Sequence, residues 1–143
     1  LTEHVEERQC FAALINKQKT YLYFRISGGF PRYRLPVTTF DHEYLQSIRN
    51  FETVRVEMVC HGNICRSPMA AAMLHGKSLE IATPNFVVTS SGTSAYHQGE
   101  SAHPLSQKTW ENHGLNYRHK SQPFSKQSFL DTDLILVADQ TNR

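Results

Sequence analysis

The chain has 143 residues, of which 39% are hydrophobic and 20% charged, and its formal net charge is +2. A chain of this length is expected to form one domain with its own core, and so small a net charge gives no reason to predict a nucleic-acid or membrane partner. No apolar run approaches the roughly 20 residues of a transmembrane helix, and the N-terminus lacks the pattern of a signal peptide, so we expect a cytoplasmic protein.

Residues 1–52 carry no recognisable chemistry. Apolar side chains at near-helical spacing predict a helix within residues 1–20, a strand is predicted over residues 21–26, and a short helix over residues 40–50. A basic and aromatic cluster at residues 32–34 is more typical of ordinary surface than of a nucleic-acid interface. We interpret residues 1–52 as an N-terminal extension of unknown role.

The character of the sequence changes at residue 53, where strands begin to alternate with helices. The pattern predicts strands over residues 54–59, 86–89 and 134–137, and helices over residues 69–77 and 105–112. Two of the strands are continuous apolar runs, which favours a parallel sheet in an α/β fold. Ligands of such sheets bind beyond the carboxyl ends of the strands, and Cys60 stands at one of these ends.

Residues 56–70 carry most of the functional signal. They are predicted to form a buried strand that ends at Cys60, a short loop, and a helix with Ser67 as N-cap and Pro68 in its first turn. Such a turn gathers backbone N–H groups at the positive end of a helix, where an anion is stabilised. A phosphate-sized oxyanion is therefore the predicted ligand.

The side chains of this loop suit phosphoryl transfer. A helix N-terminus and a nearby arginine favour the thiolate, so Cys60 is a candidate nucleophile, and the planar guanidinium of Arg66 matches two phosphate oxygens at once. Ser67 is placed to donate its hydroxyl to the sulfur. Gly62 permits close backbone approach, and Asn63 tolerates a left-handed conformation while its amide braces the loop.

The segment C-H-G-N-I-C-R-S-P at residues 60–68 resembles the signature loop of the low-molecular-weight protein tyrosine phosphatases. The resemblance continues at S-S-G-T-S-A-Y-H-Q-G (residues 90–99), at H-K-S-Q (119–122) and at D-L-I-L-V-A-D-Q-T-N (133–142). It implies a partial phosphatase domain over residues 53–143, with a three-layer αβα fold whose parallel sheet has the order 2-1-3-4. The family's fourth strand has no counterpart here.

The resemblance also implies roles for single residues. Cys60 is implied to form a phosphocysteine and Arg66 to bind phosphate, while Asn63 and Ser67 tune the loop. Tyr96 is implied to form an aromatic wall of the cleft, although the residues alone fit a loop anchor equally well. The expected phosphate-binding set is His61, Gly62, Asn63, Ile64, Cys65 and Tyr96. Cys65 is implied to form a reversible disulfide with the nucleophile, although a packed small side chain is the alternative. His119 matches a structural histidine, for which we expect core packing.

The expected substrates follow from the same resemblance: a phosphotyrosine protein or a small aryl phosphate, with inorganic phosphate as product and ligand. No metal or cofactor is predicted, because neither the three cysteines nor the eight histidines have the spacing of a metal site. Arsenate reductase of the same fold is one alternative, although no cysteine follows Cys65 to relay oxidation. A non-catalytic phosphate- or phosphotyrosine-binding module is the other.

The sequence departs from the family pattern in several places. The family's general acid lies in a D-P-[YF] motif that is not found before Arg143, and the chain starts at Leu1, so we expect a fragment with weak or no activity. One flank of the third strand is then expected to lie open unless the N-terminal extension covers it. Glu57 occupies a usually apolar position of the central strand, where a lone carboxylate is costly without a partner.

Overall fold

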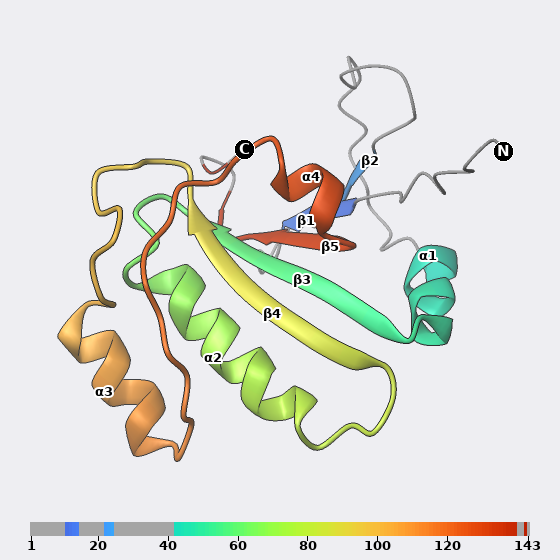
Figure 1. Ribbon diagram of the computed structural model, residues 1–143, viewed down its shortest axis with the longest axis horizontal. Coiled ribbons are helices and arrows are strands. Elements are labelled where there is room, and N and C mark those ends of the chain that lie inside the picture. The colour runs from blue at the N-terminus through green and yellow to red at the C-terminus, as the bar shows by residue number, and fades with distance from the viewer. Residues whose placement is uncertain (1–10, 15–21, 25–41, 140–141, 143) are drawn as a thin grey trace, which may run out of the picture.

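The structure of the chain is a computed structural model that describes residues 11–14, 22–24, 42–139 and 142 (Figure 1). The elements in chain order are β1 (Phe11–Leu14), β2 (Leu22–Phe24), α1 (His42–Ser47), the 3-10 helix η1 (Ile48–Asn50), β3 (Thr53–Cys60), α2 (Arg66–Ser78), β4 (Asn85–Gly92), α3 (Pro104–Asn112), α4 (Ser128–Asp131) and β5 (Leu134–Val137). None of the helices among these residues is long and apolar enough to cross a membrane.

The sheet has the order β2-β1-β5-β3-β4, and β4, β3 and β5 are parallel. The predicted α/β fold with a parallel sheet is therefore confirmed. β3 is the central strand of this group, with Thr53 to Cys60 paired to Asn85 to Gly92 on one side and Val56 to Val59 paired to Leu134 to Val137 on the other. Both neighbours run parallel to β3, so their carboxyl ends meet at Cys60.

β1 covers the flank of β5 that was expected to lie open. It pairs with β5 in parallel from Phe11↔Leu134 to Leu14↔Val137, and β2 pairs antiparallel outside it. β1 thus stands in the place that the order 2-1-3-4 gives to a fourth strand. The predicted helix within residues 1–20 is wrong at residues 11–14, because the unpaired backbone groups of β5 are satisfied by an extended partner and not by a helix. The remaining residues of that prediction lie outside the described ranges.

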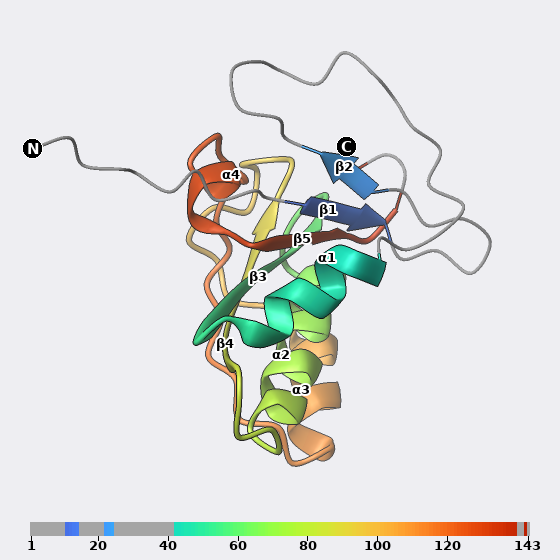
Figure 2. The same ribbon diagram turned by 90° about the vertical axis from the view of Figure 1, so that its right-hand side faces the viewer.

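Alternation along β3 divides the core between the two faces of the sheet. Val54, Val56 and Met58 pack with Ile48 after α1 and with Ala71 of α2, whereas Val59 packs with Ile135 and Val137 of β5 and with the half-buried Phe124 and Phe129. A third cluster, built on Ala72, Ala102 and Trp110, joins α3 to the outer side of α2. The helices α1, α2 and α3 therefore lie on one side of the sheet and α4 on the other, as Figure 2 shows.

The helices differ from prediction in their start points and in one added helix. α2 begins at Arg66 with Cys65 in the N-cap position and no side-chain cap, so the prediction of Ser67 as N-cap is wrong. The short helix α4 was not predicted, because its four residues lie in a polar stretch without helical periodicity. The helix over residues 40–50 is present from His42, with a 3-10 turn as its last part.

Candidate active site

The loop between β3 and α2 (residues 60–67, the cysteine loop) has its carbonyl groups turned outward. Five successive carbonyl oxygens accept hydrogen bonds from segments outside the loop: Cys60 O from Thr93 N (2.8 Å), His61 O from Ser94 N (2.9 Å), Gly62 O from Ser121 Oγ (3.2 Å), Asn63 O from His119 Nε2 (2.7 Å) and Ile64 O from His103 N (2.7 Å). The C=O and N–H of one trans peptide point in opposite directions. The N–H groups of residues 62–65 therefore point toward the interior of the loop.

Cys60 lies at the base of this ring of N–H groups. Its side chain is 2% exposed, and its Sγ accepts a hydrogen bond from Asn63 N at 3.3 Å, which is one of the inward N–H groups. The hydroxyl of Ser67 lies 3.0 Å from the same sulfur. Ser67 Oγ also lies 3.3 Å from Ser91 O, and a hydroxyl has a single proton to give. When Cys60 is a thiolate, the Ser67 hydroxyl would donate its hydrogen bond to the sulfur instead of to Ser91 O.

Asn63 holds the loop in shape from inside. Its φ of +52° lies in the left-handed region, which asparagine tolerates better than most residues, and its side chain is completely buried. Its Nδ2 donates to Ser67 Oγ (2.8 Å) and Ser90 Oγ (3.0 Å), and its Oδ1 accepts from Gln122 N (2.9 Å). Every polar atom of this side chain is bonded, so the strained turn is fixed in one conformation.

His119 braces the loop from behind. Its Nε2 donates to Asn63 O and its Nδ1 lies 3.4 Å from Ser90 Oγ. Burial lowers the pKa of His119 below its ordinary value, and the hydrogen bond to the Asn63 carbonyl offsets part of that shift. The expected core packing is thus replaced by a hydrogen-bonding role, in which the neutral ring is the favoured form.

Gly92 allows the end of β4 to approach the loop. A Cβ at Gly92 would stand 2.6 Å from His61 O and 3.1 Å from Asn63 N, a contact that no side chain can make. The next two residues, Thr93 and Ser94, donate their N–H groups to the loop carbonyls described above. A glycine at the end of β4 is therefore needed to bring these donors into place.

Arg66 is the first residue of α2, and its guanidinium donates to the carboxylate of Asp139, which follows β5. Both side chains are accessible, at 53% and 33% exposure. The pair links the start of α2 to the carboxyl end of β5, so an anion in the loop would meet a guanidinium that is already held in position.

The rim of the loop carries two aromatic rings, an exposed one at Tyr96 and a half-buried one at His97. Tyr96 is 84% exposed, and its ring meets the ring of His97 edge-on with the centroids 4.8 Å apart. Nδ1 of His97 lies 2.9 Å from Glu100 Oε2. His61 and Cys65 are also exposed.

A sequence profile of one family, Low molecular weight phosphotyrosine protein phosphatase, matches residues 55–143. The chain belongs to this family.

Two relatives illustrate the similarity in sequence. A low molecular weight protein-tyrosine-phosphatase of Streptomyces coelicolor is 36% identical over 88 residues, which cover 61% of this chain and 54% of the relative. A low molecular weight phosphotyrosine protein phosphatase of Sus scrofa is 36% identical over 91 residues, covering 63% and 58%. The chain therefore spans little more than half the length of these family members.

The fold is similar to that of solved structures as well. The crystal structure of a Drosophila arginine phosphatase matches with a TM-score of 0.59 and 33% identity, over 61% of this chain and 55% of that one. The three-layer arrangement around a parallel sheet is therefore the arrangement of the phosphatase family, as the sequence predicted.

The structure brings together the predicted residues of the family loop. Cys60, Asn63 and Ser67 form one hydrogen-bonded cluster, while Arg66 and Tyr96 lie at its outer side. The pairing of Cys65 with Cys60 in a disulfide stays a prediction. Sequence reasoning gave no role to Ser90, Ser121 or Gln122, although all three lie in stretches that resemble the family.

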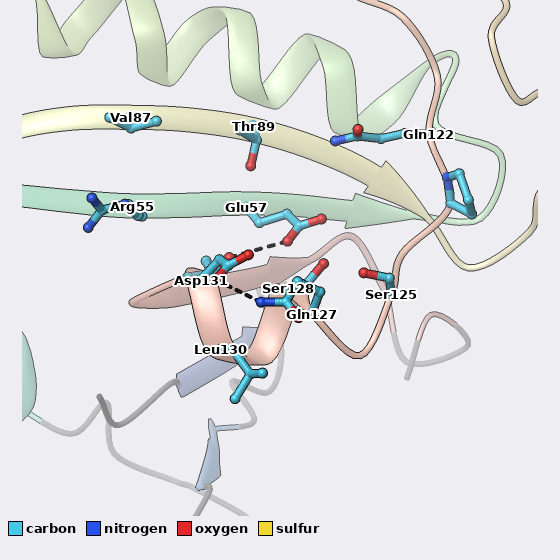
Figure 3. Close-up of a pocket in the computed structure, with 12 residues that line it drawn as sticks. Arg55, Glu57, Val87, Thr89, Gln122, Ser125, Gln127, Ser128, Leu130 and Asp131 are labelled. Carbon is cyan, nitrogen blue, oxygen red and sulfur yellow. Dashed lines mark hydrogen bonds between the residues drawn. The ribbon is translucent and has the colours of Figure 1, made fainter. Parts of the chain in front are cut away.

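A pocket of about 510 Å³ lies elsewhere, on the face of the sheet opposite α2 (Figure 3). It is lined by side chains of β3, β4 and the α4 region, among them Arg55, Glu57, Thr89 and Asp131, and by no residue of the cysteine loop. In the part of the chain that the structure describes, no three His, Cys, Asp or Glu side chains gather in a way that could hold a metal ion.

Proposed function

We propose that this chain carries the phosphate-binding half of a phosphatase that hydrolyses phosphotyrosine and other aryl phosphates through a phosphocysteine on Cys60. The observation that carries the proposal is the arrangement of the cysteine loop. Inward N–H groups surround a buried sulfur that already accepts one of them, from Asn63 at 3.3 Å. Such an arrangement stabilises the anionic phosphoryl group in the transition state of its transfer, and it also stabilises an anionic sulfur.

In the proposed reaction, the thiolate of Cys60 attacks phosphorus in line, and the bond from phosphorus to the aryl oxygen breaks as the S–P bond forms, so that the aryl oxygen leaves as a phenolate that takes its proton from water. The loop N–H groups bind the three equatorial oxygens during this transfer. Water then attacks the phosphocysteine, inorganic phosphate is released, and the electron pair of the S–P bond returns to sulfur. Arg66 contributes a planar pair of donors to the same oxygens, and its contact with Asp139 keeps it near the loop. Ser67 stabilises the thiolate when the phosphocysteine is hydrolysed. Tyr96, exposed at the rim, offers an aromatic face to the phenyl ring of the substrate.

We expect phosphate and vanadate to bind well and turnover to be slow, since the family's D-P-[YF] motif does not occur within the 143 residues. Phosphotyrosine is the proposed substrate class. One structural relative is named an arginine phosphatase, so peptides carrying phosphotyrosine and phosphoarginine belong in the same assay. Arsenate reduction, or binding without turnover, are the competing functions.

The test is hydrolysis of para-nitrophenyl phosphate by the 143-residue chain and by Cys60→Ser. The substitution is expected to abolish turnover while vanadate still binds, because the loop N–H groups remain in place. Cys10→Ser is the matched control and should keep the wild-type rate. Undiminished turnover in Cys60→Ser would refute the proposal, and arsenate-dependent oxidation of thioredoxin without phosphate release would favour the reductase.

A further inference from the structure

The pocket on the face of the sheet opposite α2 has one wall made by β3 and β4. Arg55 pairs with Val87 and Glu57 with Thr89, and because alternate residues of a strand share a face, all four side chains belong to this wall. The α4 segment forms the facing wall, as Figure 3 shows. The volume of about 510 Å³ lies within the range of small-molecule sites, so the pocket has room for a small organic group.

Hydrogen bonds to the backbone hold the two walls together. Arg55 N donates to Asp133 Oδ2 at 2.7 Å and Asp133 N donates to Arg55 O at 2.9 Å, which ties the end of the α4 segment to β3. Gly92 N donates to Gln122 O (2.9 Å) and Phe124 N donates to Gly92 O (2.7 Å), which ties the start of that segment to β4. The pocket is therefore held in shape from both ends without a ligand.

Glu57 is the most deeply buried charged side chain of the lining, at 4% exposure. Its Oε2 accepts from Thr132 Oγ1 at 3.4 Å, and its Oε1 has no hydrogen-bond partner among the described residues. In Figure 3 the carboxylate points from β3 toward the α4 segment. A buried carboxylate is costly unless a countercharge and donors compensate it, so this one is directed at the pocket with most of its hydrogen-bonding capacity unused.

A second carboxylate, that of Asp131, lies one residue before Thr132 in the same lining. Its Oδ1 accepts from Gln127 Nε2 at 2.9 Å, and its Oδ2 has no partner in the part of the chain that the structure describes. The ion pairs among the described residues do not include Arg55, the one cationic side chain of the lining. The pocket therefore presents two carboxylates that no side chain of the lining neutralises by direct pairing.

This arrangement favours one class of ligand. A neutral molecule would displace water and leave the charge of Glu57 uncompensated, and an anion would be repelled by both carboxylates. A metal ion needs more ligands, and the described residues contain no group of three His, Cys, Asp or Glu that could hold one. Among organic cations, a guanidinium suits two carboxylates better than an ammonium does, because it is more weakly hydrated and its planar fork offers five N–H donors.

We propose that this pocket binds a guanidinium group, carried by a small molecule or by an arginine side chain, with Glu57 as its main partner and Asp131 as the second. The site is separate from the cysteine loop, so the proposal does not depend on the phosphatase function. It also gives a reason for the stability cost of Glu57, since a binding group that lacks its ligand destabilises the free protein.

The test is calorimetric titration of the 143-residue chain with butylguanidinium and with butylurea, its neutral isostere. We expect butylguanidinium to bind about tenfold or more tightly than butylurea, and Glu57→Gln to remove this preference by weakening butylguanidinium by about tenfold or more. Asp131→Asn, at an exposed position, should weaken it by about threefold. Equal affinity for the two probes, wild-type affinity in Glu57→Gln, or no saturable binding of butylguanidinium would each overturn the proposal.

Three further measurements keep a local effect apart from a general one. Glu52→Gln, which removes the same charge at an exposed position before β3, is the matched control and should leave the affinity unchanged. Glu57→Leu guards against misfolding: it should be more stable than the wild type and yet fail to bind butylguanidinium, and retained binding would refute the site. Vanadate affinity should be the same in Glu57→Gln and in the wild type.

The source of the guanidinium is distinguished with arginine that is acetylated and amidated at its ends. Affinity equal to that of butylguanidinium would indicate an arginine side chain of a partner protein, since the added peptide groups are then tolerated. Much weaker binding of this probe would indicate a free small molecule.

Discussion

Two buried polar side chains, six positions apart in the chain, are accommodated in very different ways. Asn63 is completely buried in the cysteine loop, and each of its side-chain polar atoms has a partner within 3.0 Å. Glu57 is 4% exposed in the middle of β3, and among the described residues its carboxylate has one hydrogen bond, from Thr132 Oγ1 at 3.4 Å. The first group is part of a satisfied network, whereas the second borders a polar pocket (Figure 3).

The difference shows where buried polarity supports this fold and where the fold only tolerates it. A buried polar group that keeps all its hydrogen bonds fixes one local conformation, while a buried carboxylate with one long contact loses more hydration than it regains. The cysteine loop therefore depends on Asn63, and β3 forms in spite of Glu57. The following substitutions test this contrast, in order of expected effect.

Replacing Asn63 should have the largest effect. Asn63→Ala removes three side-chain hydrogen bonds and places alanine at a φ of +52°, so we expect a loss of about 3 kcal/mol in the free energy of unfolding. Vanadate affinity should fall with it, because the inward N–H groups lose their fixed positions. Urea unfolding and vanadate titration measure the two effects. Asn112→Ala, at the exposed end of α3, is the matched control.

A stable and vanadate-binding Asn63→Ala variant would show that the carbonyl partners outside the loop are enough to shape it. The contrast with Glu57 would then lose its basis, since Asn63 would be as dispensable as the carboxylate.

Replacing Glu57 should act in the opposite direction. Glu57→Leu removes a poorly paired buried carboxylate and adds apolar contact beside Val59 and Ile135, so we expect a gain of about 1–2 kcal/mol in stability. Vanadate affinity should not change, because the pocket contains no residue of the cysteine loop. Glu52→Leu, at an exposed position before β3, should have almost no effect on unfolding. Destabilisation by Glu57→Leu would mean that the carboxylate has a partner that compensates for its burial.

The smallest expected effect is that of replacing His119, which should change the pH dependence of stability. The pKa of His119 is lowered in the folded chain, so the unfolded chain binds more protons once the pH drops toward about 6.5. The His119 contribution to stability is therefore complete above that pH and decreases as the pH falls below it. His119→Gln should flatten the slope of unfolding free energy between neutral and mildly acidic pH, whereas His113→Gln should not. A wild-type chain whose free energy of unfolding increases as the pH falls from neutral to mildly acidic would contradict the lowered pKa.

The two side chains also show how much of the fold and of the site could be predicted from the sequence. The cysteine loop was predictable because its residues are adjacent and their types match one chemistry, from Cys60 to Ser67. β5 was predicted with its exact bounds, Leu134 to Val137, because four apolar residues follow a polar stretch. The burial of Glu57 was expected from its place in an apolar strand, and the structure confirms it.

What the sequence did not predict depends on contacts between distant residues. Ser67 has a favourable type for an N-cap, but its hydroxyl is taken by Cys60 and Asn63 inside the loop. The partners of Asn63 at Ser90 and Gln122 lie 27 and 59 positions away, which no local pattern reveals. β1 has helical spacing in the sequence and becomes a strand only because β5 offers it an edge.

The central claim is that the sulfur of Cys60 receives the phosphoryl group within the cysteine loop. Rapid acid quenching of the 143-residue chain with dinitrophenyl phosphate, followed by mass spectrometry of its peptides, tests this directly. We predict one phosphoryl group on the peptide that contains Cys60, and none in Cys60→Ser. Turnover in which the phosphoryl group is found on His97 or on another residue would contradict the account. So would the absence of a covalent intermediate under conditions in which phosphocysteine hydrolysis is rate-limiting.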